Sequence, residues 1–171
     1  MRPSYEKLIT WKRSNRWVVT GGSECRPDNG RTLIANGSTL LPGTEEMMSW
    51  EIGDHGFVMG LSGLVPDAIA SLLPAWLDGW LAEQGLARDD IATWAVHPGG
   101  PRILSAVERC LDVQLDVSRA VLREYGNMSS PTILFVLDRL RREGAPLPCV
   151  ALGFGPGLTA EAMLLTQGAA R

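Results

Sequence analysis

The 171-residue chain has few cysteines, no long apolar run and no excess of basic residues. Its three cysteines, Cys25, Cys110 and Cys149, are odd in number and irregularly spaced, which excludes a disulfide framework and a zinc site built on Cys-x-x-Cys pairs. The longest apolar runs, at 133–137 and 150–152, are far shorter than the roughly 20 residues of a membrane-spanning helix. With a formal charge of −3, the chain lacks the basic stripe of a nucleic-acid-binding surface.

The N-terminus is charged and has no apolar segment of the kind that a secretory signal carries. Hydrophobic residues make up 45 % of the chain and charged residues 20 %, which is the composition of a globular protein with one core. We therefore expect a soluble cytoplasmic protein with no metal site, which binds neither nucleic acid nor membranes.

Residues 1–32 differ from the rest of the chain. They are rich in basic and turn-forming residues, and only the stretch 17–20 has strand-like content. We predict that they form a lead-in of uncertain structure, followed by one domain over residues 33–171.

Hydrophobic periodicity in residues 33–171 alternates between the patterns of strands and helices. The clearest helix begins at Pro66, with apolar residues on one face, and ends at Gly85. Other helices are predicted at 101–111, 116–126 and 130–144, and strands at 33–40, 49–52, 56–61, 90–97, 146–152 and 158–166. This order predicts an α/β domain, in which helices cover a layered sheet that contains the last three strands. The helix that begins near Pro131 is apolar on most sides through Leu137, so we expect it to be among the most buried elements.

His97 is the first candidate for chemistry. It ends a predicted strand and precedes a Pro-Gly-Gly-Pro loop, and ligands of open α/β sheets bind outside the carboxyl ends of strands. Gly99 and Gly100 allow a substrate to approach the backbone closely. A histidine bonded to a loop carbonyl is the structural alternative, and for His55, which lies in a predicted turn, the structural interpretation is favoured.

Asn127 follows Gly126 and precedes a helix. An amide there could be a second donor beside His97, the pair that stabilises an oxyanion or enolate, although Gly-Asn at a helix break is also ordinary turn chemistry. The glycine-rich stretch 153–157 either borders a cavity or only connects two strands. No cysteine lies at a strand-to-helix turn, and no serine lies in a Gly-x-Ser-x-Gly context, so the chain has no evident nucleophile.

Three motifs occur in order: Trp-Ala-Val-His-Pro-Gly-Gly-Pro at 94–101, Leu-Arg-Glu-Tyr-Gly-Asn-Met-Ser-Ser at 122–130 and Gly-Phe-Gly-Pro-Gly-Leu-Thr at 153–159. In order and spacing they closely resemble the C-terminal half of type III polyketide synthases, the chalcone and stilbene synthase family. The resemblance covers about residues 33–166, and Leu-Pro-Gly-Thr at 41–44 and Gly-Phe at 56–57 also resemble bacterial members.

The resemblance implies a thiolase-like fold made of two similar halves, usually in a homodimer, and a Cys-His-Asn triad that condenses malonyl-CoA decarboxylatively onto an acyl-CoA starter. No cofactor is implied beyond the coenzyme A thioesters, which are substrates. By motif, His97 and Asn127 match the catalytic histidine and asparagine. Phe57 matches the phenylalanine that gates the entry tunnel. Four further positions match the cavity or its border: Met48, Ser129, Phe154 and Pro156.

One departure from the family is the missing nucleophile. The family's catalytic cysteine lies in the N-terminal half, whereas only 96 residues precede His97 and they contain one cysteine, Cys25, in a different context. We therefore expect this chain to be inactive alone and to need a complementary N-terminal half. Two alternatives stay open: a non-catalytic fragment or partner half, and a relative of ketoacyl-carrier-protein synthases, which usually carry His-Gln-Ala-Asn where this chain has His-Pro-Gly-Gly-Pro.

Overall fold

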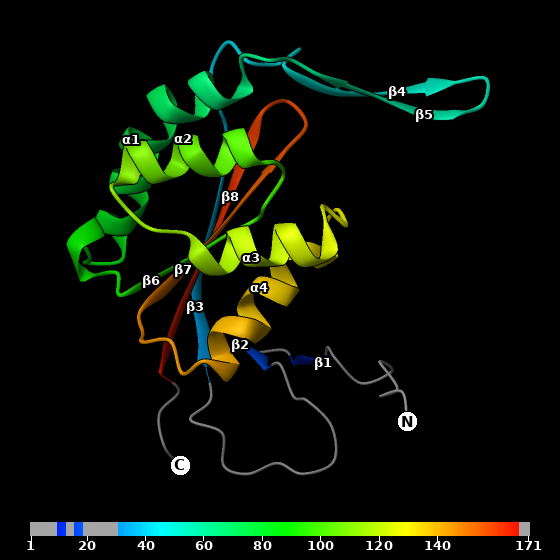
Figure 1. The fold of residues 1–171 in the computed structure, drawn as a ribbon. Helices are drawn as coiled ribbons and strands as arrows, with labels where there is room; N and C mark the ends of the chain where they lie inside the picture. Colours follow the sequence, from blue (N-terminus) through cyan, green and yellow to red (C-terminus); the bar gives the residue numbers. More distant parts are fainter. Residues whose placement is uncertain (1–9, 13–15, 19–30, 168–171) are drawn as a thin grey trace, which may run out of the picture.

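The structure is a computed structural model that describes residues 10–12, 16–18 and 31–167 (Figure 1). Strands β1 (Thr10–Lys12) and β2 (Arg16–Val18) pair antiparallel. The second overlaps the predicted strand-like stretch 17–20. Residues 1–9, 13–15 and 19–30 of the lead-in, Cys25 included, lie outside the described residues, and its last two residues, 31–32, belong to the next strand. The side chain of Phe57 also lies outside what the structure describes.

A mixed four-stranded sheet forms the centre of the domain, in the order β3 (Arg31–Leu40), β8 (Thr159–Gln167), β7 (Cys149–Gly155) and β6 (Thr93–Val96). Its β8 strand pairs antiparallel with β3 and with β7, whereas β6 pairs parallel with β7. The parallel connection from β6 to β7 passes through three helices, so the predicted element order is confirmed. The helices that connect the strands are α1 (Val65–Glu83), which precedes β6, and α2 (Pro101–Leu111), α3 (Asp116–Tyr125) and α4 (Pro131–Arg142), which lie between β6 and β7.

The alternation of side chains along β7 produces two cores, one on each face of the sheet. Val150 and Leu152 belong to a larger core with the apolar faces of α1 and α2. Cys149 and Ala151 belong to a smaller core with residues of α3 and α4. The sheet therefore lies between two helical layers, which confirms the predicted α/β layering (Figure 1).

A separate hairpin extends away from this body (Figure 1). It consists of β4 (Met48–Gly53) and β5 (Gly56–Leu61), which pair antiparallel up to Gly53 and Gly56. Asp54 and His55 form the two-residue loop between them, as the turn interpretation of His55 predicts.

Several predicted boundaries are corrected by the pairing. Strand β7 begins at Cys149, three residues after the predicted start, and continues to Gly155 inside the predicted glycine turn. Gly153 and Gly155 pair with β8, because ladder hydrogen bonds need only the backbone, and the turn shrinks to 156–158. Strand β6 begins later than predicted, at Thr93, since a short 3₁₀ helix occupies Arg88–Asp90.

The expectation that α4 is among the most buried elements is wrong for this chain. Val136 is fully buried, but Leu134 is 50 % exposed and Phe135 is 38 % exposed. The helix lies in the outer layer on one face of the sheet, and the part of its circumference that bears Leu134 and Phe135 is only partly covered by the described elements. The apolar residues around its circumference are therefore divided between a core-facing side and an open side.

Candidate active site

The backbone of His97 is anchored to the sheet at the end of β6. Its N–H donates to the carbonyl of Leu152 at 2.8 Å, which continues the pairing with β7. The preceding N–H, of Val96, points away from β7 and donates to Oγ of Ser118 at 3.2 Å. Because β6 is the edge of the sheet, this buried hydroxyl of α3 supplies the acceptor that a further strand would otherwise provide.

Two glycines border the side chain of His97. A β-carbon at Gly99 would lie 3.7 Å from its Cδ2 atom, and one at Gly153 would lie 4.0 Å from its β-carbon. The ring is partly buried, and this burial lowers the pKa of His97 below its ordinary value of 6.5. A neutral imidazole with one N–H donor is therefore the prevailing form near pH 7.

Asn127 contacts the loop that follows His97. Helix α3 ends at Gly126, whose φ of 72° suits glycine and turns the chain toward that loop. The side-chain Nδ2 of Asn127 donates to the carbonyl of Gly99 at 3.2 Å, and its Oδ1 accepts the N–H of Ser129 at 2.9 Å. These bonds orient the amide so that its donor end faces the His97 loop.

Thr132, which the sequence analysis did not single out, supports this turn. Its buried hydroxyl accepts the N–H of Met128 and donates to the carbonyl of Ser129, both at 2.8 Å. Ser130, at the N-cap position of α4, makes no such side-chain bond. A threonine in the first turn of a helix after a Ser-Ser-Pro sequence is the signal that could have identified it.

The structure brings His97, Gly99 and Asn127 together. Two further predicted residues are close to them in the sequence. Ser129 adjoins Asn127 with a left-handed φ of 64°. Gly100 is extended, and the space where its β-carbon would lie is open.

Met48 of the hairpin and Pro156 of the glycine-rich stretch lie at the β7–β8 turn, whereas Phe57 pairs with Ile52 next to the far end of the hairpin. The carbonyl of Met48 accepts the N–H of Gly157 at 2.9 Å, and Pro156 is exposed in that turn. Phe154 packs against the larger core beside α1 and α2, so Gly153 is the residue of this stretch that lies beside His97. That these residues border a substrate cavity stays a prediction.

Neither described cysteine is an activated nucleophile. Burial raises the pKa of Cys149 to about 11, and burial also raises the pKa of the half-buried Cys110. Within residues 31–167 and the two short strands before them, no group of three or more His, Cys, Asp or Glu residues could hold a metal ion. No helix in the described part of the chain combines the length and apolarity needed to cross a membrane.

The lowered pKa of His97 predicts a pH dependence of stability. Below a pH of about 6.5, His97 binds a proton readily in the unfolded chain but less readily in the folded chain, where its pKa is lower. The free energy of unfolding should therefore decrease as the pH falls. The His97→Gln variant, which keeps an amide donor but does not titrate, should lose less stability between pH 8 and pH 5.5. Urea unfolding at the two pH values measures this, and an equal loss in both proteins would contradict it.

The comparison with solved structures defines the fold as thiolase-like. A crystal structure of PKS-I from the brown alga Ectocarpus siliculosus superposes with a TM-score of 0.77 at 37 % identity, over 85 % of this chain and 41 % of that chain. The profile described as "Chalcone and stilbene synthases, C-terminal domain" matches residues 32–168. The chain therefore belongs to the chalcone and stilbene synthase family, the type III polyketide synthases, rather than to the ketoacyl-carrier-protein synthases.

Two curated relatives agree with this assignment. The chain is 38 % identical over 155 residues to a 1,3,6,8-tetrahydroxynaphthalene synthase of Streptomyces peucetius subsp. caesius, covering 86 % of this chain and 41 % of the relative. It is 36 % identical over 134 residues to type III polyketide synthase 21 of Oryza sativa subsp. japonica, covering 74 % of this chain and 34 % of the relative. The chain thus spans less than half the length of these relatives.

Proposed function

We propose that this chain supplies the histidine and asparagine of an acyltransferase that condenses malonyl-CoA decarboxylatively onto an acyl-CoA starter. The observation that carries the proposal is the arrangement around Gly99. The His97 ring lies against this glycine, and the Asn127 amide donates to its carbonyl. Two side-chain N–H donors from distant parts of the sequence thus meet at one loop.

The chemistry of condensation needs such donors at two stages. Loss of carbon dioxide from a malonyl thioester leaves an enolate oxygen, and attack of the enolate on an acyl thioester forms a tetrahedral oxyanion. An imidazole N–H and a carboxamide N–H directed at the thioester oxygen stabilise the negative charge at both stages. The lowered pKa of His97 supports this role, because a neutral imidazole donates without adding the positive charge that would bind free anions indiscriminately.

The acyl group needs a thiolate, which this chain does not offer among its described cysteines. We therefore propose that a complementary N-terminal half of the same fold provides the cysteine and closes the cavity. In this proposal the half belongs either to the same longer polypeptide or to a second chain. A homodimer of the completed enzyme, which the family resemblance implies, is part of the proposal.

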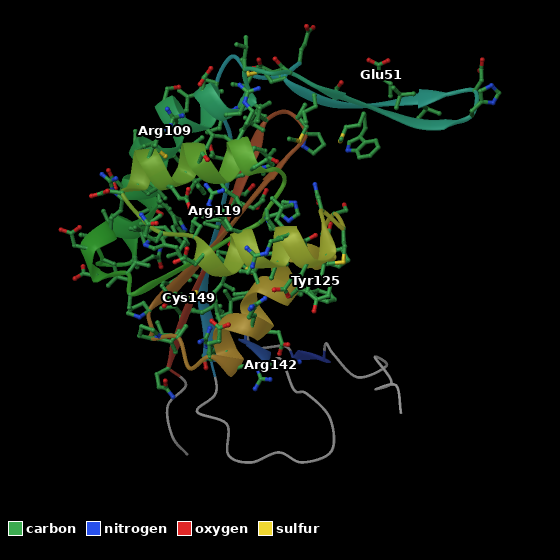
Figure 2. The ribbon with its side chains drawn as sticks, in the orientation of Figure 1. Glu51, Arg109, Arg119, Tyr125, Arg142 and Cys149 are labelled. Atoms are coloured by element: carbon green, nitrogen blue, oxygen red, sulfur yellow. The ribbon has the colours of Figure 1, made fainter. Side chains whose placement is uncertain are left out.

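Exposed apolar side chains support a complementary half. One group lies where α3 ends and α4 begins. It contains Leu134, Phe135 and Tyr125, and the ring centroids of Tyr125 and Phe135 are 5.2 Å apart. Figure 2 shows Tyr125 at this end of α3. A second group lies on the hairpin, where the β4–β5 pairing places Trp50 opposite Met59 and more than half of each side chain is exposed. Ile52 is 87 % exposed on the same face of the hairpin. Contiguous exposed apolar surface of this kind is typical of interfaces.

A chimera tests the proposed function. In it, the part of the Streptomyces relative that precedes its C-terminal domain is followed by residues 32–168 of this chain. We expect the chimera to convert malonyl-CoA to polyketide products, detected by liquid chromatography and mass spectrometry, and each half alone to form none. A folded chimera that becomes acylated on its cysteine but never extends the acyl group would contradict the proposal.

A further inference from the structure

Helix α3 carries Asn127 just beyond its C-terminal end, so the position of this amide depends on where α3 packs against the sheet. Of the ten residues of α3, all of which the structure describes, two are buried: Ser118 and Val121. They are three positions apart and therefore lie on one face of the helix. Val121 packs in the smaller core, which also contains Ala95 of β6. The other buried position holds a hydroxyl, so one of the two buried contacts that hold α3 is polar.

The hydroxyl of Ser118 binds the residue that precedes His97. Its Oγ accepts the N–H of Val96 at 3.2 Å, and both residues are at most 1 % exposed. A hydrogen bond requires a defined distance and direction, which an apolar contact does not. From Ser118 to Gly126 the helix rises about 12 Å, and a regular helix carries its position over this length. The bond therefore fixes the start of the Asn127 turn relative to the end of β6.

A second attachment joins α3 to α2. Arg119, the residue after Ser118, forms a bidentate ion pair with Glu108 of α2, in which Nε donates to Oε1 at 2.9 Å and Nη2 donates to Oε2. The same carboxylate accepts the N–H of Leu115, at the N-cap position of α3, at 3.3 Å. Bidentate pairs of this kind are geometrically specific. Figure 2 shows Arg119 between α2 and α3.

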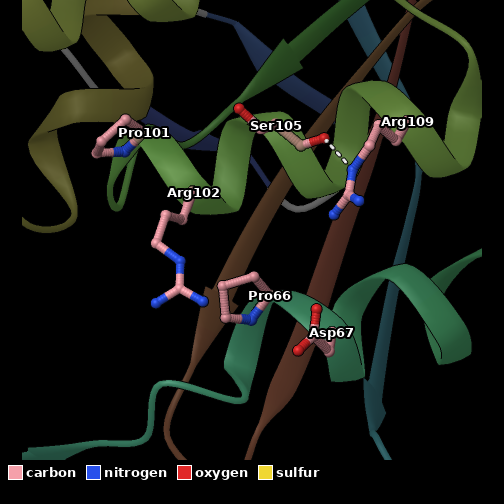
Figure 3. Close-up of a pocket in the computed structure, with 6 residues that line it drawn as sticks. All are labelled: Pro66, Asp67, Pro101, Arg102, Ser105 and Arg109. Carbon is pink, nitrogen blue, oxygen red and sulfur yellow. Dashed lines mark hydrogen bonds between the residues drawn. The ribbon is translucent and has the colours of Figure 1, made fainter.

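Ser105 completes this attachment. Its hydroxyl accepts the Nη2 of Arg119 at 2.9 Å, and its carbonyl accepts the Nε of Arg109, one turn further along α2, at 3.2 Å (Figure 3). Ser105 and Glu108 are three positions apart and lie on one face of α2. The guanidinium of Arg119 therefore binds that face through two neighbouring side chains.

The two attachments lie on either side of the His97 loop. Strand β6 ends at Val96 and α2 begins at Pro101, so residues 97–100 connect the two elements that α3 binds. Adjacent residues of α3 thus hold the element before the loop and the element after it. The bond from the Asn127 amide to the carbonyl of Gly99 is made within this frame.

We propose that Ser118 and Arg119 are positioning residues, which hold α3 so that the Asn127 amide and the His97 imidazole reach one oxygen atom of the substrate. Neither residue contacts the reacting atoms in this proposal. Their effect is on geometry, and a misplacement of about 1 Å can lower a rate about 100-fold. The inference rests on the proposed function, because the oxygen atom is that of the thioester.

Substitution of Ser118 in the chimera tests the inference. Ser118→Ala leaves the buried N–H of Val96 without an acceptor, so we expect kcat to fall about tenfold while the KM for malonyl-CoA changes less than about twofold. Ser118→Thr keeps a hydroxyl and should restore most of the rate. The matched control is Thr93→Val at the opposite end of β6, which removes a buried hydroxyl that donates to the carbonyl of Pro146 at 2.7 Å. This variant should lose a similar amount of stability, measured by its unfolding midpoint, and keep its kcat.

The second attachment is tested in the same way. Arg119→Gln removes the cation that binds Glu108 and should lower kcat by a similar factor, again with little change in KM. Arg123→Gln, at an exposed position of the same helix, is its control and should keep the kcat of the unaltered chimera. An active chimera in which Ser118→Ala and Arg119→Gln are as fast as their controls would refute the positioning role alone.

Hydrogen exchange in the 171-residue chain tests the positioning role without any catalysis. The N–H of His97 donates to the carbonyl of Leu152 at 2.8 Å, and the N–H of Gly99 donates to the carbonyl of His97 at 2.9 Å. Both amides should exchange about tenfold faster in Ser118→Ala than in Thr93→Val, because the end of β6 opens locally while the sheet stays folded. Equal exchange in the two variants would overturn the inference, whether or not the chimera is active. Faster exchange in Ser118→Ala together with an inactive chimera would refute the proposed function alone.

Discussion

Replacing Asn127 or His97 with alanine in the completed enzyme is expected to lower the condensation rate about 10²- to 10³-fold, because each variant removes one donor to the oxyanion, a loss of roughly 2.7–4 kcal/mol. The effect should fall on kcat more than on KM, since the donors bind the transition state more strongly than the substrate. The double variant should be little worse than either single one, because the two donors act on the same oxygen.

The Asn127→Asp variant tests whether Asn127 acts as a hydrogen-bond donor to the substrate or only holds the shape of the turn. A carboxylate at this position still accepts the N–H of Ser129 and keeps the turn, but it has no N–H for the Gly99 loop or for an oxyanion. We expect it to fold like the unaltered protein and to be as inactive as Asn127→Ala, as measured by product formation in the chimera. The matched control is Asn36→Asp at an exposed position of β3, which should retain full activity. Near-normal activity of Asn127→Asp would show that the amide only shapes the turn.

The isolated 171-residue chain is expected to form no stable acyl-enzyme with an acyl-CoA. At pH 8 a thiol whose pKa is about 11 is ionised in only about one molecule in a thousand, and Cys149 is in addition fully buried. The pKa of Cys110 is also raised by burial, so neither described thiol offers the thiolate that attacks a thioester. The completed enzyme, by contrast, should gain one acyl group per active site.

Intact-protein mass spectrometry after incubation with a starter acyl-CoA measures this difference. Alkylation with iodoacetamide provides the folding control: Cys149 should react only after urea unfolds the chain. A stoichiometric adduct on Cys25, Cys110 or Cys149 of the folded chain would locate the nucleophile in this chain and remove the reason for a complementary half.

Features set by nearby residues could be predicted from the sequence. The helix predicted from Pro101 to Leu111 has the same bounds in the structure, because proline suits its first turn and the apolar period is regular. Gly126 ends α3 where the pattern indicates, since its φ of 72° is one that glycine adopts readily. The hairpin loop at Asp54 and His55 likewise follows from local turn signals. The motif series around His97 and Asn127 predicted the family, which the comparisons confirm.

Only the tertiary structure decided which faces are covered and which groups meet. The apolar pattern of α4 predicts burial on most sides, but burial also needs a neighbour on each side, and the described chain covers one. The alternation of the sheet places Gly153 beside His97 and directs Phe154 to the opposite core, because the two residues point to opposite faces of β7. The contact of Asn127 with Gly99, 28 positions earlier, depends on how helices α3 and α4 dock on the sheet. Periodicity and turn chemistry are properties of short segments and can be predicted from sequence, whereas these contacts are set by packing between segments that are distant in the chain.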